Sequence, residues 1–367
     1  MDRVPFFDLK RQHAALRGEL MPAIESVIAK SAFSGGEFVE VFEKQFAEYC
    51  GAKYARGVGS GTAALHLALL ALGVGPEDEV IVPSHTFIAS AWGISYVGAK
   101  PVFVDCLPDT WEIDPAAVEK ALTEKTRAII GVHLYGVPCD MGTLKKIAKE
   151  YNLFLIEDCA QAHGALYGDM KVGTIGDIGC FSFYPSKNLG AVGEAGAIIT
   201  NDANVAEKVR MLRSHGEKEK YVHEMVGYNE RMDGIQAAVL SVKLKHLDAW
   251  NTRKAEVVKK YVDGIKNPAV ILQVIPADVT SAYHLFVITT DNRKAFIEHV
   301  RSHGIDTSMH YPTPCHLQKA YTPLGYSRGD FLNTEYVADH CVSLPLFPEL
   351  TDEEVDRVIE AVNSYGG

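Results

Sequence analysis

The stretch FSFYPSKNLGAVGEAGAIIT, residues 181–200, places a single lysine in a turn between two apolar segments. CFSFY is typical of a strand, PSKNLG of a turn and GEAGAIIT of a second strand. Because the flanking residues are apolar and small, we expect the turn to pack inward, where partial burial turns a lysine into a nucleophilic amine. Lys187 is therefore predicted to react with a carbonyl compound. A solvated surface charge is the simpler alternative.

A second motif, LFLIEDCAQAHGA, lies upstream at residues 153–165. Its apolar residues predict a short strand that Glu157 and Asp158 close. Ligands of parallel sheets bind outside the carboxyl ends of the strands, so an acid here could hold a cationic ring nitrogen. A carboxylate that caps the next turn would look the same in sequence.

The third motif is GVGSGTAALHLALLALG, residues 57–73, where a strand runs through glycines into a helix. The free N–H groups of such a helix start suit a phosphate, and Gly59, Gly61 and Thr62 would let it approach. A plain helix cap with loop glycines is the alternative. The same glycines fit a dinucleotide fingerprint and hence a nicotinamide-dependent dehydrogenase, but the acid required after the next strand is absent.

Together these motifs supply a phosphate cradle, a carboxylate for a pyridine nitrogen and a lysine for an aldehyde. That combination predicts pyridoxal 5′-phosphate chemistry. The carboxylate would keep the ring nitrogen protonated, and Lys187 would hold the aldehyde at rest and later carry protons.

The same segments, with NERMDGIQAAVLSVKL and HYPTPCHLQKAY, resemble the nucleotide-sugar aminotransferases of the DegT/StrS type across nearly the whole chain. The resemblance implies the aspartate-aminotransferase fold (fold type I) and a homodimer with shared active sites. Lysine rather than histidine at position 187 matches the amino-transferring members and not the deoxygenating dehydratases.

The resemblance also implies roles residue by residue. Lys187 matches the catalytic lysine, Asp158 the partner of the pyridine nitrogen, Gln161 the contact to the ring hydroxyl and Phe87 the aromatic that stacks on the ring. Gly61, Thr62 and Ser182 match phosphate contacts, and Asn229 matches a residue that reaches the cofactor of the neighbouring subunit. Candidates for sugar or diphosphate contacts are Tyr184, Tyr221, His223, Arg231, His310 and Tyr311. Each of these lesser residues could instead be core, loop or surface.

The resemblance implies a reaction that moves an amino group from L-glutamate, which leaves as 2-oxoglutarate, to a nucleotide-linked ketosugar. HYPTP, residues 310–314, most resembles members that act on dTDP-linked 3-keto-6-deoxyhexoses, giving a dTDP-3-amino-3,6-dideoxyhexose. A 4-keto or UDP-linked sugar is the main alternative. Two further alternatives are a non-catalytic regulatory protein of this fold and a pyridoxal phosphate lyase of small amino acids.

Strand-like and helix-like segments alternate through the first two thirds of the 367 residues, which predicts an α/β domain with a mostly parallel sheet. We expect a large cofactor-binding domain with an N-terminal arm over residues 1–245 and a small α+β domain over residues 246–367. The net charge of −11 argues against nucleic acid or an anionic membrane as partner. Seven scattered cysteines without metal spacing predict a reducing, cytoplasmic setting and no metal site.

Overall fold

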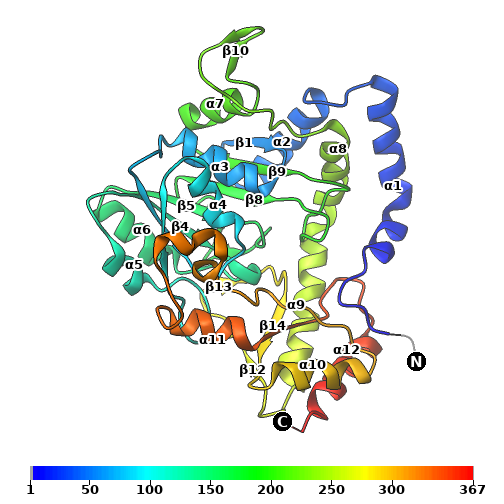
Figure 1. Cartoon of the computed structure of the whole chain (residues 1–367). Helices are drawn as coiled ribbons and strands as arrows, with labels where there is room; N and C mark the ends of the chain where they lie inside the picture. Colours follow the sequence, from blue (N-terminus) through cyan, green and yellow to red (C-terminus); the bar gives the residue numbers. More distant parts are fainter. Residues whose placement is uncertain (1–2, 367) are drawn as a thin grey trace.

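The computed structural model describes residues 3–366 and is built around a seven-stranded sheet with the strand order β1-β9-β8-β5-β4-β2-β3 (Figure 1). The strands of this sheet are short and mostly buried: β1 Tyr54–Val58, β2 Glu79–Pro83, β3 Lys100–Val104, β4 Thr126–Val132, β5 Phe154–Asp158, β8 Ile178–Ser182 and β9 Gly196–Thr200. Only β9 runs antiparallel to its neighbours, β1 and β8. The predicted mostly parallel sheet is thus confirmed.

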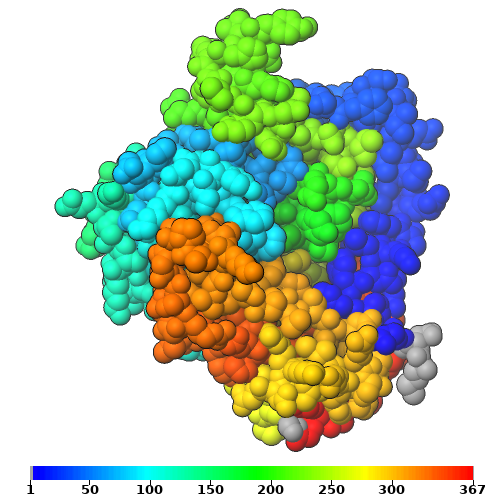
Figure 2. Space-filling view, in the orientation of Figure 1, coloured from blue at the N-terminus to red at the C-terminus, as the bar shows by residue number. Residues whose placement is uncertain are grey.

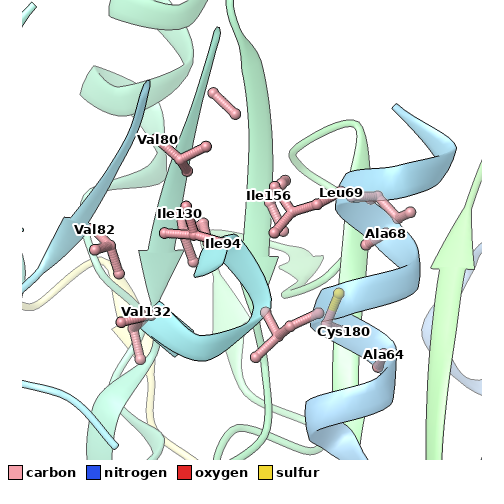
Figure 3. Close-up of a cluster of buried hydrophobic side chains, with 14 of the residues drawn as sticks. Ala64, Ala68, Leu69, Val80, Val82, Ile94, Ile130, Val132, Ile156 and Cys180 are labelled. Atoms are coloured by element: carbon pink, nitrogen blue, oxygen red, sulfur yellow. The ribbon is translucent and has the colours of Figure 1, made fainter. Parts of the chain in front are cut away.

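Helices pack on both faces of this sheet because its apolar strands need cover on each side. The helices of this part are α1 Leu9–Lys30, α2 Glu37–Cys50, α3 Gly61–Ala71, α4 Ala89–Tyr96, α5 Pro115–Ala121, α6 Met141–Glu150 and α7 Ala203–Leu212, with the 3₁₀ turn η1 Leu134–Gly136. Figure 3 shows the side chains of α3 and α4 interleaved with those of the central strands. Small residues of α3, such as Ala64 and Ala68, let this helix lie close to the sheet.

The long helix predicted near residues 233–265 is interrupted. It consists of α8 Gly234–Lys243, the 3₁₀ turn η2 Leu244–His246 and α9 Leu247–Gly264. The described elements after α9 are β12 Ile271–Leu272, β13 Val279–Thr280, β14 Phe286–Thr289, α10 Arg293–Ser302, η3 Cys315–Leu317, η4 Lys319–Leu324, α11 Leu332–His340, β15 Cys341–Leu344 and α12 Asp352–Asn363.

A small antiparallel sheet, β12-β14-β15, and the helices α10 and α12 form a separate core at the lower end of the molecule in Figure 1. The predicted boundary near residue 245 falls just before α9. The segment of residues 315–341 nevertheless adds Cys315, Tyr321 and Val337 to the core of the large sheet. Figure 2 shows this segment, in orange, seated on the α/β part, so the division at residue 245 stays a prediction.

Two smaller pairings complete the fold. The short strands β6 Leu166–Tyr167 and β7 Met170–Lys171 form a sheet with β13. The hairpin of β10 Glu217–Glu219 and β11 Val222–His223 projects from the top of the molecule (Figure 1). None of the helices formed by residues 3–366 is long and apolar enough to cross a membrane.

Candidate active site

A cavity of about 420 Å³ opens where the carboxyl ends of β4, β5 and β8 meet the first turn of α3. Most of the predicted site residues line it, from segments far apart in the sequence. These are Gly61, Thr62, Phe87, Asp158, Gln161, Ser182, Tyr184, Lys187, His310 and Tyr311. The topology therefore gathers the three sequence motifs at one sheet edge, as parallel α/β folds do with their ligands.

Lys187 lies in the turn between β8 and β9, with its amide hydrogen-bonded to the carbonyl of Tyr184. Burial lowers the pKa of Lys187 to about 8, although the nearby Asp158 carboxylate opposes the shift. Within the described residues, neither a hydrogen bond nor an ion pair engages its Nζ, which borders the cavity. A solvated surface lysine, the simpler alternative, does not describe this side chain. Such an amine could attack a carbonyl.

The pKa of Lys187 leads to a measurable pH dependence. With a pKa of about 8, Lys187 carries an unprotonated amine in roughly a tenth of the molecules at pH 7 and in about nine tenths of them at pH 9. The rate at which cofactor-free protein fixes pyridoxal phosphate on Lys187, followed by borohydride trapping and mass spectrometry, should therefore rise through pH 8 and level off near pH 9. A rate that keeps rising past pH 10, as for an exposed lysine, would contradict this placement.

Asp158 ends β5 and is 5% exposed. Its Oδ2 accepts a hydrogen bond from Ser90 Oγ at 2.7 Å, and its Oδ1 accepts one from the amide of Ala160 at 3.1 Å. Thr86 Oγ1 lies 2.9 Å from Ser90 Oγ and can donate to it, since the Ser90 proton is committed to Asp158. The carboxylate is thus fixed at the cavity wall, and among residues 3–366 no ion pair neutralises it. It could hold a protonated ring nitrogen.

Glu157, the other acid of this motif, points to the opposite face of the strand. It is fully buried and accepts hydrogen bonds from the amides of Gly173, Ile175 and Gly176, each at 2.7 Å. Its Oε2 also lies 3.1 Å from His133 Nε2. Glu157 therefore anchors a loop, which leaves Asp158 as the acid of this motif that lines the cavity.

The first turn of α3 approaches β8 so closely that only glycine fits at position 61. A Cβ added to Gly61 would lie 2.5 Å from Cβ of Ser182. Ser60 caps the helix by accepting the amide of Ala63 at 3.0 Å. Within the described chain the amides of Gly61 and Thr62 have no protein acceptor, and both residues border the cavity. These N–H groups, with the positive end of the helix dipole, could hold a phosphate.

Replacing Gly61 by alanine should therefore damage the phosphate cradle. The added methyl group would push α3 away from Ser182, costing about 1–3 kcal/mol of stability and weakening cofactor retention. Thermal unfolding and equilibrium dialysis of pyridoxal phosphate measure the two effects. Gly18→Ala is the matched control, since a Cβ at Gly18, inside α1, meets nothing within 4 Å. A Gly61→Ala protein as stable and as well loaded as the control would contradict the proposed cradle.

Phe87, Gln161 and Tyr311 meet at one side of the cavity. Phe87 is 49% exposed, so the alternative of a core residue is wrong. Its centroid lies 5.4 Å from that of Tyr311, and Gln161 Nε2 donates to Tyr311 Oη at 3.0 Å. Gln161 Oε1 accepts the amide of Tyr135 at 2.7 Å, which fixes the amide so that its N–H₂ faces the cavity. Phe87 could cover the face of an aromatic ring, and Gln161 could donate to a ring hydroxyl.

Tyr184 and His310 also line the cavity. Tyr184 is 50% exposed, which excludes the alternative of core packing. His310 Nδ1 lies 2.8 Å from Ser343 Oγ, and its ring stacks on Phe6 of the N-terminal arm at 5.7 Å. Burial, assisted by the charge of Lys187, lowers the pKa of His310 to about 4, so this imidazole is neutral at pH 7.

The structure does not bring Tyr221, His223, Asn229 and Arg231 to the cavity of their own chain. Tyr221, at 80% exposed, and His223 lie on the projecting β10–β11 hairpin. Asn229 pairs with Ser214, and Arg231 Nη1 lies 3.1 Å from His215 Nδ1. Whether they complete a neighbouring subunit's site stays a prediction.

Several residues that line the cavity were not predicted: Ser60, Leu65, Thr86, Ala89, Val132, His133, Leu134, Ala160, Ser186, Glu194 and His284. Ser60 and Thr86 directly precede predicted positions and could have been found as the polar ends of the same motifs. His284 carries no motif and comes from a distant segment, so only the fold could place it here.

The cavity fits pyridoxal phosphate. The unpartnered amides of α3 suit its phosphate, the Asp158 carboxylate its ring nitrogen, the exposed face of Phe87 its ring and the free amine of Lys187 its aldehyde. The fit rests on the donor set rather than on any one residue.

Comparison with known proteins supports the same chemistry. Residues 15–363 match the model of the DegT/DnrJ/EryC1/StrS aminotransferase family. The chain is 45% identical over 364 residues, 99% of this chain and 96% of the relative, to the Streptomyces venezuelae dTDP-3-amino-3,4,6-trideoxy-alpha-D-glucose transaminase. It is 46% identical over 363 residues, 99% of each, to the Aneurinibacillus thermoaerophilus dTDP-3-amino-3,6-dideoxy-alpha-D-galactopyranose transaminase. A Geobacillus stearothermophilus relative, 45% identical over 99% of this chain and 98% of its own, is named a pleiotropic regulatory protein.

Solved structures agree with these relatives. The crystal structure of S. venezuelae DesV in complex with a ketimine intermediate superimposes with a TM-score of 0.97 at 45% identity, covering 99% of this chain and 98% of that one. A Bacillus subtilis protein, NtdA, with bound cofactor PMP gives a TM-score of 0.93 at 32% identity, covering 99% of this chain and 85% of that one.

Proposed function

Because the chain belongs to the DegT/DnrJ/EryC1/StrS aminotransferase family and is a pyridoxal phosphate-dependent aminotransferase, we propose that its acceptor is a dTDP-linked 3-keto-6-deoxyhexose and its amino donor L-glutamate. The product would be a dTDP-3-amino-3,6-dideoxyhexose. One observation carries this proposal: two relatives at 45% and 46% identity, aligned over 99% of the chain, are both named transaminases of dTDP-3-amino sugars.

Lys187 and Asp158 serve different parts of the proposed reaction. Bound here, pyridoxal phosphate supplies an electron sink for the carbon that loses a proton. The Nζ of Lys187 takes that proton from the amino-bearing carbon of the donor, and in the second half-reaction returns a proton to the former keto carbon of the sugar. Its pKa of about 8 leaves a usable fraction of free base near neutral pH. The carboxylate of Asp158, held by Ser90, would bind the ring nitrogen.

The charges of the substrates support a shared active site. Glutamate carries two carboxylates and the nucleotide sugar a diphosphate, yet Lys187 is the one lysine or arginine among the described residues that line the cavity. A second subunit is the natural source of further cations. We propose that the segment with Asn229 and Arg231, which lies outside its own cavity, completes the site of the neighbouring subunit in a homodimer.

Mixing two inactive variants tests this sharing. Lys187→Ala and the double variant Asn229→Ala/Arg231→Ala should each be inactive as homodimers. After dissociation and random reassociation, half of the dimers are mixed and each mixed dimer holds one complete site, so about a quarter of the wild-type activity should return. The control is one sample of the Lys187→Ala protein mixed with a second sample of the same variant and treated in the same way. No recovery in a mixture shown to contain mixed dimers would contradict a shared site.

The reverse reaction tests the substrate. Protein loaded with pyridoxal phosphate is given 2-oxoglutarate and a dTDP-3-amino-3,6-dideoxyhexose, and glutamate formation is measured. We expect turnover with this sugar and much less with 4-amino or UDP-linked analogues. Faster turnover of a 4-amino or UDP-linked sugar would show that the acceptor is the alternative, a 4-keto or UDP-linked sugar. Turnover of free amino acids alone would end the sugar proposal.

A further inference from the structure

The residue that follows Lys187 is the centre of a buried hydrogen-bond network. Asn188 Nδ2 donates to the carbonyl of Ala282 at 2.6 Å and to Asn251 Oδ1 at 2.8 Å. A backbone carbonyl only accepts, so this contact fixes which end of the amide is nitrogen. Asn188 Oδ1 is therefore an acceptor, and it lies 3.2 Å from Lys254 Nζ and 3.1 Å from His284 Nδ1.

This network sets the tautomer of His284. Because Asn188 Oδ1 can only accept, His284 must donate from Nδ1, which leaves a lone pair on Nε2. Within residues 3–366 the Nε2 of His284 makes no hydrogen bond. It is also not among the fully buried polar atoms that lack a partner, so it is accessible. Since the ring of His284 lines the same cavity as Lys187, the lone pair is open to that cavity.

Lys254 supplies the charge behind the network. It belongs to α9, is 3% exposed and forms no ion pair within the described chain. Burial lowers its pKa to about 7, with Glu349 opposing. Burial, and after it the positive charges of Lys187 and Lys254, hold the pKa of His284 well below its usual value; His310 and His163 are the other titratable groups that face the ring.

We propose that Lys254 is a positioning residue for amino transfer: with Asn188 it holds His284 as the neutral Nδ1–H tautomer, whose bare Nε2 presents a hydrogen-bond acceptor to the molecule bound in the cavity beside Lys187. His284 thereby offers the cavity a neutral acceptor and does not compete with the amine of Lys187 as a cation. The proposal rests on amino transfer at this cavity but not on the identity of the sugar.

Nitrogen-15 NMR of histidine-labelled protein tests the tautomer without any substrate. In the wild-type protein at pH 7 the His284 signal, identified by its loss in His284→Gln, should show a protonated Nδ1 and a bare Nε2. An Nε2–H tautomer or an imidazolium at pH 7 would overturn the proposal. This readout is independent of activity, so a failed sugar assay leaves it intact.

Lys254→Met tests the positioning role, and Lys243→Met is its matched control. Lys243 is also fully buried, with its Nζ 3.1 Å from His13 Nε2 between α8 and α1, away from the cavity. Losing the Lys254 charge should raise the NMR-measured pKa of His284 by about one unit and move the acid limb of the half-reaction with glutamate up by the same amount. Lys243→Met should move neither.

A Lys254→Met protein whose His284 titration and acid limb match the wild type would overturn the role of Lys254. If this variant fails to fold, the tautomer in the unmodified protein still decides the proposal.

Discussion

Replacing Lys187 by alanine is expected to lower the rate of amino transfer by at least about 10⁴-fold. Two functions disappear together: the amine that holds the cofactor aldehyde and the base that carries the proton. No other described lysine borders the cavity, so none can stand in. Stopped-flow measurement of the half-reaction with L-glutamate, on protein loaded with pyridoxal phosphate, gives the effect.

The fold should survive this change, because Lys187 Nζ makes no protein hydrogen bond in the described structure and its removal takes away a charge that its surroundings disfavour. Thermal unfolding is therefore expected to match or exceed that of the wild type. Lys243→Met provides a comparison in which a buried lysine is lost outside the cavity. A Lys187→Ala protein that keeps more than a hundredth of the activity would contradict the assigned role.

Asp158→Asn is expected to lower the same rate by about 10³-fold or more, at unchanged stability. Asparagine has the same shape: its Oδ1 can accept the amide of Ala160, and its N–H₂ can donate to Ser90 Oγ, whose own hydroxyl can turn to donate to Thr86 Oγ1. It carries no charge, however, so the ring nitrogen loses the partner that keeps it protonated and the electron sink weakens. The rate of the glutamate half-reaction and the thermal midpoint, measured on the same samples, separate the two effects.

The neighbouring acid provides the contrast. Glu157→Gln turns one oxygen that accepts backbone N–H groups into an N–H₂ group, which should cost about 3 kcal/mol or more of stability. Its direct effect on chemistry should be small. If Asp158→Asn lost stability and Glu157→Gln lost only rate, the two acids would have been assigned the wrong way round.

The sequence supported these assignments unevenly, for physical reasons. The turn that holds Lys187, the first turn of α3 and the end of β5 each have a local signal: apolar strands, glycines and a terminal acid. Their meeting at one edge follows from the rule for parallel sheets. Which of Glu157 and Asp158 faces the cavity depends on the phase of a strand, and the resemblance to a family rather than the pattern chose Asp158.

What the sequence could not indicate are contacts made across long separations. Lys254 and His284 reach Asn188 from α9 and from a loop before β14, and neither lies in a motif. The break of the predicted long helix at η2 and the return of residues 315–341 to the first core likewise depend on packing between distant segments. The proposed role of Asn229 and Arg231 lies in the active site of the neighbouring subunit. The sequence of one chain cannot indicate such a contact, because it depends on how two subunits pack together.

The most direct test of the account is to locate the covalent link between protein and cofactor. The purified protein is loaded with pyridoxal phosphate, reduced with borohydride and digested, and the modified peptide is identified by mass spectrometry. We expect one phosphopyridoxyl group per chain, on Lys187. A label on Lys254, Lys243 or any other lysine in place of Lys187, or no label on a protein that turns over amino donors, would contradict it.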